Sequence, residues 1–327
     1  MKIFVTGATG HVGICLMNEL QKIKNAQITA LILNNDQDVK YLNQDKINFV
    51  YGDVRAYDLL NENILENSIV IHLASFVSIT NKDRKKVVDI NVGGTKNIVD
   101  ICKKKNAYMI YVSSVHALKA TNSNLIDENS ELNVDSKDSC YEESKSKATK
   151  LVREALNDGL KGSIIYPSGI LGPFDYKNSE LTCLLEMIDK DQLIAYIKGG
   201  YAFVDVRDVC SIILKLASSQ IIDEFIVSGE YLSIEDIIKI VQEFKKKKIK
   251  IPCISKTLAI LAIPFLSLKA KILKKKPLFS LYSLKTLNAP CNFKNDKVEM
   301  VFDFSYTPIK KTILDSLKRL KLIADKN

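Results

Sequence analysis

Short apolar runs alternate with segments of helical pattern along the first half of the chain. The runs are apolar without strict alternation, as expected for strands that helices cover on both faces. Right-handed crossovers between such strands give a parallel, doubly wound sheet, so the predicted fold class is α/β. The runs are KIFVT, QITALIL, INFVY, SIVIHLA, AYMIYVSS and GSIIYP, and the helical segments are His11 to Lys22, Asp83 to Lys105 and Tyr141 to Asp158.

The pattern loosens after Pro167 into loops and shorter elements. A capping box, Ser233 with Asp236, predicts a helix that runs to about Lys245, and an amphipathic helix begins near Ile309. Residues 1–170, with a return at about 203–229, are assigned to the sheet domain, and residues 171–202 and 230–327 to a smaller C-terminal lobe. The other elements expected here are a helix near Ser179 to Lys190, a strand YAFVDV, a helix Arg207 to Ser218 and a strand EFIVSG, with both strands extending the sheet.

The amino-acid composition limits which binding partners and which cellular compartment are expected. A chain of 327 residues with 46% hydrophobic content can bury a sizeable core. Its net charge of +9 is nearly all excess lysine, which could suggest an anionic partner. The lysines are scattered or in short runs without interleaved aromatics, so we interpret them as solvated helix ends and expect no nucleic-acid partner. The local runs are Lys103 to Lys105, Lys245 to Lys248 and Lys274 to Lys276.

Cysteine and histidine usage argues against disulfides and metal. The seven cysteines are never closer than 27 residues apart, which excludes a C-x-x-C pair and a small secreted disulfide framework. The three histidines, at 11, 72 and 116, form no H-E-x-x-H or Cys/His cluster, so we expect no metal. Glycines interrupt the apolar N-terminus where a signal peptide needs an unbroken hydrophobic segment, which favours a cytoplasmic protein.

One segment has membrane character. From Ser255 to Lys276 about a dozen apolar residues surround Pro264 and a basic tail follows. The segment is too short to span a bilayer, so stable membrane insertion is not expected. A cover helix over a ligand cleft is the favoured interpretation, and a helix lying on a membrane surface is the alternative.

A glycine-rich turn follows the first strand directly and precedes a helix. In TGATGHVG the glycines stand three apart, at positions 7, 10 and 13, so the spacing is G-x-x-G-x-x-G. A phosphate can approach backbone N–H groups only where no Cβ intervenes, and a helix N-terminus adds unpaired donors and partial positive charge. A dinucleotide pyrophosphate is the natural ligand, which makes the sheet domain a dinucleotide-binding Rossmann domain.

The stretch YEESKSKA places a phenol and an amine on one helix face. Tyr141 and Lys145 stand four residues apart, so both can project into one cleft. A neighbouring ammonium favours the phenolate, so we expect Lys145 to lower the pKa of Tyr141 and allow proton exchange. Ser114, at the end of the strand YMIYVSS, can hydrogen-bond the same substrate oxygen, and Ser113 is the weaker candidate.

Taken together, these motifs resemble the extended short-chain dehydrogenase/reductases, the NAD-dependent epimerase/dehydratase family, and within it the dihydroflavonol-4-reductase-like branch. The matching stretches are TGATGHVG, GDV, HLAS, NVGGTKN, YVSS, YEESK, YPSGILGP and FVDVRDV, in order and over nearly the whole chain. The resemblance implies that Tyr141 is the acid/base, that Lys145 activates it and holds the nicotinamide ribose, that Ser114 orients the substrate oxygen, and that Asn91 is structural. The candidate cofactor contacts are Gly7, Thr9, Gly10, His11, Val12, Gly13, Asn34, Asp53, Val54, Leu73, Ala74, Ser75, Val112, Tyr141, Lys145, Pro167 and Ser168.

Selectivity between NAD and NADP depends on the residue that ends the second strand. A carboxylate there accepts from the ribose 2′-OH, and a cation pairs with a 2′-phosphate. Leu33, Asn34 and Asn35 offer neither charge, and Asp36 lies slightly beyond the usual position. On this ground NADP is favoured over NAD.

The resemblance also separates possible reactions. Its dehydratases carry an acidic residue beside the catalytic Ser or Thr, whereas Ser114 is followed here by Val115 and His116. Its epimerases carry an asparagine where this chain reads YPSGILGP. We therefore expect reduction of a ketone or aldehyde of a small molecule, with a nucleotide-sugar epimerase holding NAD as the alternative and a non-catalytic NAD(P)-binding sensor as the second. His116 is a further candidate for substrate contact.

The resemblance further implies a homodimer through the helices Asp83 to Lys105 and Tyr141 to Asp158. Specificity is expected from the second lobe, Leu171 to Val204 and Glu230 to Pro308, where no chemical motif is recognisable.

Overall fold

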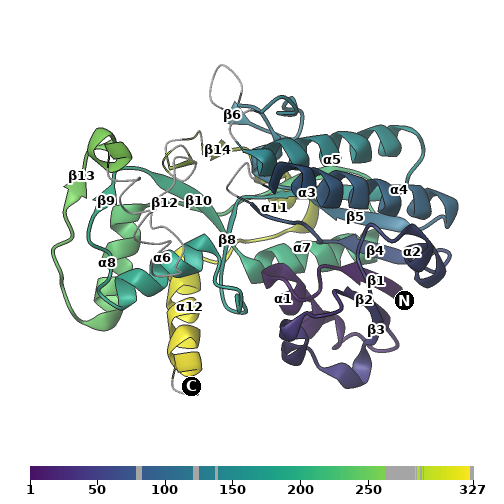
Figure 1. Cartoon of the computed structure of the whole chain (residues 1–327), viewed down its shortest axis with the longest axis horizontal. Helices are drawn as coiled ribbons and strands as arrows, with labels where there is room; N and C mark the ends of the chain where they lie inside the picture. The colour runs from purple at the N-terminus through teal and green to yellow at the C-terminus, as the bar shows by residue number, and fades with distance from the viewer. Residues whose placement is uncertain are drawn as a thin grey trace.

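The computed structural model describes residues 1–78, 83–120, 125–136, 139–261, 284, 286, 287, 289 and 291–324. Figure 1 shows the sheet domain on the right and the smaller lobe on the left, with the C-terminal helix α12 (Ile309–Ala324) packed in the lobe. The helix α12 thus lies apart from the main sheet.

The sheet domain is built on one parallel, seven-stranded sheet. Its strand order is β11-β7-β5-β4-β1-β2-β3, and every pairing is parallel. The order reverses between β1 and β4, which is where doubly wound sheets bind ligands at the carboxyl ends of their strands. The fold class is confirmed. The strands are β1 (Lys2–Thr6), β2 (Gln27–Ile32), β3 (Asn48–Tyr51), β4 (Ile69–His72), β5 (Tyr108–Val112), β7 (Gly162–Pro167) and β11 (Glu224–Val227).

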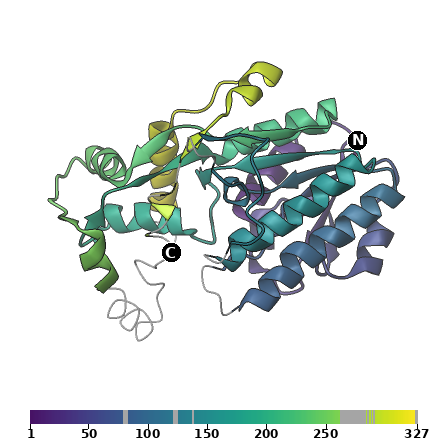
Figure 2. The ribbon, with the colours of Figure 1, turned by 90° about the horizontal axis from the view of Figure 1, so that it is seen from above.

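Helices cover both faces of this sheet, which explains its continuous apolar strands. In β1, Ile3 and Val5 belong to the core under α1 (His11–Leu20) and α7 (Val206–Ser219). Phe4 between them belongs to the core under α4 (Gly94–Lys104) and α5 (Cys140–Asn157). Figure 2 shows α4 and α5 side by side on their face. Successive strand residues point to opposite faces, so both must be apolar.

The helix predicted from Asp83 to Lys105 is interrupted. It forms α3 (Arg84–Val88), a π-helical turn (Asp89–Gly93) and then α4. Such π turns occur frequently at functional sites, and this one contains Asn91. The helix α2 (Tyr57–Asn63), which the pattern did not predict, precedes β4.

The second lobe has its own small sheet and core. β8 (Gly169–Leu171), β10 (Gly200–Asp205) and β12 (Tyr231–Ser233) form it, covered by α6 (Glu180–Asp189), α8 (Ile234–Lys245) and α12. The predicted capping box of Ser233 and Asp236 is present at the start of α8. Short paired strands complete the described part: β9 (Tyr196–Ile197) with β13 (Cys253–Ile254), and β6 (Leu125–Ile126) with β14 (Asn292–Phe293), which leads into α11 (Asp296–Phe302).

One strand prediction was wrong. The run YAFVDV was expected in the main sheet, but its residues 203–205 pair with β8 instead. The physical reason lies at the end of β7, where the Ser168 N–H donates to the Val227 carbonyl of β11. Because β11 already occupies that sheet edge, the chain leaves the sheet after Pro167 and starts a new one with β8. The return to the sheet domain is therefore made by α7 and β11.

Candidate active site

The glycine turn has the shape that a pyrophosphate needs. Gly7 has a φ of +72°, a left-handed conformation that favours glycine, and a Cβ there would lie 2.7 Å from the Ala74 nitrogen. A Cβ on Gly13 would lie 2.2 Å from the Gly7 carbonyl oxygen. Gly10 is the N-cap of α1 and has no side chain to cap it. Among the described residues no side chain caps the first amides of α1, which are therefore available to an anion at the carboxyl edge of the sheet.

A carboxylate lies against this turn. The hydroxyl of Thr9 donates to Asp36 Oδ2 at 2.5 Å, and the Asp38 N–H donates to Asp36 Oδ1 at 3.0 Å. Burial acts to raise the pKa of Asp36, but these hydrogen bonds and the nearby Lys177 lower it overall. Asn34, expected to contact cofactor, is exposed. In the sequence Asp36 lies beyond the usual position for cofactor selectivity, but the loop after β2 brings its side chain back to the glycine turn.

A segment of the chain after β8 crosses onto the same edge, and we call residues 172–178 the strap. His11 Nε2 lies 3.0 Å from the Pro173 carbonyl oxygen. The ring of Tyr176 stacks on Tyr41. Lys177 Nζ lies 3.4 Å from Asp36 Oδ2 and 3.5 Å from Asp38 Oδ2. The strap therefore ties the second lobe to the glycine turn and to the end of β2.

Two serines with buried hydroxyls flank the site without partners. Ser75 follows β4, and Ser168 follows β7 and is 7% exposed. Neither hydroxyl oxygen has a hydrogen-bond partner among the described residues. A buried hydroxyl left unpaired is costly, so both suit a bound polar ligand. Together with the free amides of α1 they fit an NAD(P) molecule, and both are on the predicted contact set.

The loop after β4 is held by a buried hydrogen-bond chain centred on His72. Ala74 N–H donates to Thr6 Oγ1, so the Thr6 hydroxyl proton is available to His72 Nδ1 at 2.7 Å. The Thr95 hydroxyl donates to the Asn91 carbonyl, so it accepts from His72 Nε2, 3.0 Å away. His72 is thereby assigned as the neutral Nε2–H tautomer.

Asn91 extends this chain to the helix that carries Tyr141. Its side-chain oxygen accepts from the Phe76 N–H at 2.7 Å, and its Nδ2 donates to the Phe76 carbonyl and to Ser144 Oγ. The residue is 2% exposed. Its predicted structural role agrees with these bonds, which join the loop after β4 to α5.

The other residues that were predicted to contact the cofactor have different partners in the structure. Asp53, one of the candidate cofactor contacts, accepts hydrogen bonds from both the backbone and the guanidinium of Arg55. Val54 is buried, and its carbonyl accepts from Asn97. Leu73 N–H donates to the Thr6 carbonyl, which fixes the backbone beside the glycine turn. Val12 at the start of α1 and Pro167 at the end of β7 complete the set along this edge.

The predicted catalytic residues lie just after the end of β5 and in the first turns of α5. Ser114 caps a short helical turn (Val115–Ala117), and Ser139 caps α5 by accepting from the Tyr141 N–H. Ser114 is the side chain that acts to lower the pKa of the Tyr141 phenol. Ser113 instead bonds Thr149 Oγ1 at 2.6 Å in the core. Of the two serines, Ser114 is therefore the one positioned beside the phenol.

Lys145 is buried and does not lower the pKa of Tyr141 as we expected. Its ammonium donates to the Val112 carbonyl at 2.9 Å, and the residue is 4% exposed. Burial lowers the pKa of Lys145 to about 7. Burial raises the pKa of Tyr141 to about 12, and hydrogen bonding to Ser114 only partly opposes it. Burial is the largest cause of both shifts, and Lys145 is not among the groups that shift the pKa of Tyr141.

His116 lies next to this pair. Its backbone N–H donates to Ser114 Oγ at 3.3 Å, and its Nδ1 is 3.7 Å from the Glu142 carboxylate. Burial lowers the pKa of His116, whereas Glu142 acts to raise it. Glu142 also accepts from Ser136. His116 is thus held next to Ser114 and Glu142.

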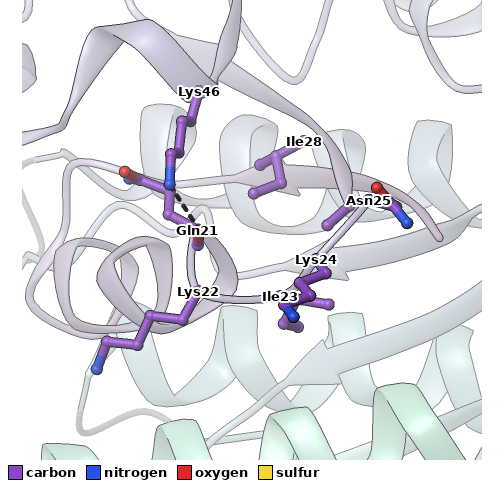
Figure 3. A pocket seen from close by; sticks show the side chains of 8 residues that line it. Gln21, Lys22, Ile23, Lys24, Asn25, Ile28 and Lys46 are labelled. Carbon is purple, nitrogen blue, oxygen red and sulfur yellow. Dashed lines mark hydrogen bonds between the residues drawn. The ribbon is translucent and has the colours of Figure 1, made fainter.

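A hollow lies away from this chemistry. Figure 3 shows it between the end of α1 and the start of β2, where Lys46 Nζ donates to the Gln21 carbonyl. This is the amino edge of the sheet, opposite the glycine turn. Its lining holds lysines and amides but no acid/base pair. In the described residues no group of three or more His, Cys, Asp or Glu side chains is gathered to hold a metal.

Comparisons with known proteins agree with this geometry. A model of the 3-beta hydroxysteroid dehydrogenase/isomerase family matches residues 4–224. The chain is 26% identical over 297 residues to the sterol demethylase protein B of Methylococcus capsulatus, which covers 88% of this chain and 89% of that protein. It is 30% identical over 210 residues to a putative dihydroflavonol 4-reductase of Synechocystis sp., which covers 64% of this chain and 60% of that protein.

The fold also matches solved structures. The Bordetella bronchiseptica enzyme WbmH in complex with NAD+ superposes with a TM-score of 0.76 at 16% identity, over 98% of each chain. At this identity the match supports the fold.

Proposed function

The chain belongs to the 3-beta hydroxysteroid dehydrogenase/isomerase family, and we propose that it is an oxidoreductase that reduces a ketone or aldehyde of a small molecule with NAD(P). The match confirms the resemblance to extended short-chain dehydrogenase/reductases that the motifs predicted. One observation carries the proposal: the Lys145 ammonium, one helical turn after Tyr141 on α5, donates to the Val112 carbonyl at the end of β5, two residues before Ser114, at the sheet edge that holds the glycine turn.

In the direction of reduction, Tyr141 donates the proton that the carbonyl oxygen gains. NAD(P) supplies the hydride when it is bound. A phenol whose pKa is about 12 is protonated at neutral pH, which suits a general acid. Ser114 donates to the same oxygen and holds it at the phenol. Lys145, whose pKa is near 7, can carry a proton at neutral pH and stabilise the phenolate that remains.

NAD is the cofactor that we propose, although the sequence favoured NADP. The support is the Asp36 carboxylate, which Thr9 anchors to the glycine turn and whose pKa is lowered. An ionised carboxylate there can accept from a ribose 2′-OH and repels a 2′-phosphate. Lys177 argues for the opposite choice, since it could pair with a phosphate, but Asp36 and Asp38 both engage it.

The substrate that we propose is an apolar alicyclic ketone of the sterol class. This rests on the family description and on the sterol demethylase relative. Turnover of sterol ketones but not of small straight-chain aldehydes is the expected result in a substrate panel.

A nucleotide-sugar epimerase is the second candidate, favoured by one observation. The strap contacts the glycine turn and the end of β2 at three places, an arrangement that can retain a cofactor through many turnovers. An epimerase would copurify with NAD and show no net cofactor oxidation, whereas a reductase would exchange cofactor and oxidise NADH in proportion to the product.

Matched serine and tyrosine variants test the proposal. Tyr141→Phe should keep cofactor binding, measured by NADH fluorescence, while kcat falls by roughly 100-fold or more. Ser114→Ala should also lower kcat, whereas Ser113→Ala, its neighbour in the core, should act mainly on stability. Unchanged kcat in Tyr141→Phe would remove the phenol from the mechanism, and total absence of turnover in the wild type would favour a sensor.

A further inference from the structure

The positive charge of this protein is concentrated in one stretch of the chain. Residues 244–295 contain 13 lysines and no aspartate, glutamate or arginine. The rest of the chain holds the other 34 lysines and arginines and all 38 aspartates and glutamates, so its net charge is −4. The overall charge of +9 is therefore a property of this stretch, and not of scattered helix ends as the sequence first suggested.

The described part of this stretch lies at one end of the molecule. Residues 246–261 follow α8 and run along the outer edge of the second lobe, at the end opposite the sheet domain (Figures 1 and 2). Lys245 and Lys247 pair with Asp191. The exposed Lys246, Lys248, Lys250 and Lys256 have no ion pair within 4.0 Å among the described residues, although Lys248 lies near enough to Glu243 to help lower the pKa of that carboxyl.

Apolar side chains are exposed farther along the same outer edge, on the short helix that begins at Lys256 (Figure 1). Residues 256–261 are helical, and Leu258 and Leu261, three residues apart, are 54% and 64% exposed. Ala259 between them is 1% exposed and packs in a small core with Ile197 and Leu284. The short helix is thus fixed to the lobe by one face and presents leucines outward on another. A helix that covered a cleft would instead bury its leucines.

We propose that this end of the lobe docks on an anionic lipid bilayer. We call the surface the basic–apolar tip, formed by Lys246, Lys248, Lys250, Lys256, Leu258 and Leu261. Lysines attract the negative surface of the bilayer, and leucines enter its interfacial region. Nucleic acid fits less well, because the tip has no arginine and no interleaved aromatic rings for bases to stack on.

The docking is peripheral. Among the residues that the structure describes, no helix has the length and apolar character to cross a bilayer. The segment Ser255 to Lys276, singled out in the sequence, lies outside the described residues from position 262 onward. The proposal uses only residues 255–261 of that segment. It goes beyond the proposed reaction, because docking on a bilayer needs neither cofactor nor substrate.

Vesicle sedimentation with the full chain tests the tip. Vesicles of phosphatidylcholine with phosphatidylglycerol should pull down the wild type more strongly than vesicles of phosphatidylcholine alone, and added salt should weaken binding. Each lysine removed should cost about fivefold in affinity, so Lys246→Gln with Lys248→Gln should cost about 25-fold. Leu258→Ser with Leu261→Ser should weaken binding at any salt concentration.

The matched control is Lys24→Gln with Lys161→Gln, two exposed lysines of the sheet domain. It removes the same charge and should bind vesicles like the wild type. Equal losses in the control and tip variants, no vesicle binding, or preferred binding of a labelled DNA duplex would overturn the proposal. Without vesicles, all variants should keep the turnover of the wild type on the ketone that the substrate panel identifies, so failure of the reaction and failure of docking are separable.

Discussion

Acid should destabilise this protein through one buried histidine. His72 is 1% exposed, and both ring nitrogens bond to threonine hydroxyls. Burial, with a smaller contribution from Lys145, lowers the pKa of His72 from 6.5 to about 3. The folded protein therefore binds this proton more weakly than the unfolded chain. The stability that the neutral ring provides is complete above pH 6.5 and is lost as the pH falls toward 3.

The size of the effect follows from these two values. A pKa difference of one unit corresponds to about 1.4 kcal/mol, so lowering the pH from 8 to 5 should cost about 2 kcal/mol through His72 alone. His72→Gln removes the titration, and its amide can still accept from Thr6 and donate to Thr95. The variant should be less stable than the wild type at pH 8 by about 1 kcal/mol for imperfect hydrogen bonds.

Urea unfolding followed by circular dichroism, at pH 8, 6 and 5, measures both proteins. Carboxylates titrate in both, so the difference between their pH dependences isolates His72. We expect the wild type to lose about 2 kcal/mol more than His72→Gln between pH 8 and 5. Parallel losses in the two proteins would show that His72 is protonated in the folded state, or that the ring is accessible to water, and would refute the hydrogen-bond chain assigned to it.

Four other outcomes are expected. Asp36→Asn should raise the kcat/KM ratio for NADPH over NADH by roughly 10-fold or more, measured in parallel assays, because it removes a charge opposite the 2′-phosphate; an unchanged ratio would exclude Asp36 from selectivity. Gly13→Ala should lose cofactor binding and lower the melting temperature, because its Cβ would lie 2.2 Å from the Gly7 carbonyl oxygen; wild-type affinity would show that the turn relaxes. Cofactor affinity should fall as the pH rises above about 7, where the buried Lys145 loses its proton, and Lys145→Met should flatten that profile in calorimetric titrations. Sedimentation velocity should give a dimer, and a monomer at all concentrations would contradict the predicted pairing through α4 and α5.

The sequence alone predicted the main sheet and supplied the candidate catalytic side chains. Each strand of the main sheet lies between two helical layers, so its residues had to be apolar on both faces, and that requirement is visible as continuous runs such as KIFVT and MIYV. Tyr141, Lys145 and Ser114 were found because their spacing and order are local properties of the chain. Glycine at position 13 was predictable because any other side chain would strike the preceding turn.

Only the tertiary structure decided how these pieces act on one another. The place of β10 depended on which strand already occupied the sheet edge, and Asp36 reached the glycine turn through a loop whose path no periodicity encodes. The pKa of Tyr141 rose instead of falling because burial is set by elements from across the chain. Spacing along the sequence fixes which groups can meet, whereas their protonation and their partners depend on the surrounding packing, which arises only when distant segments come together.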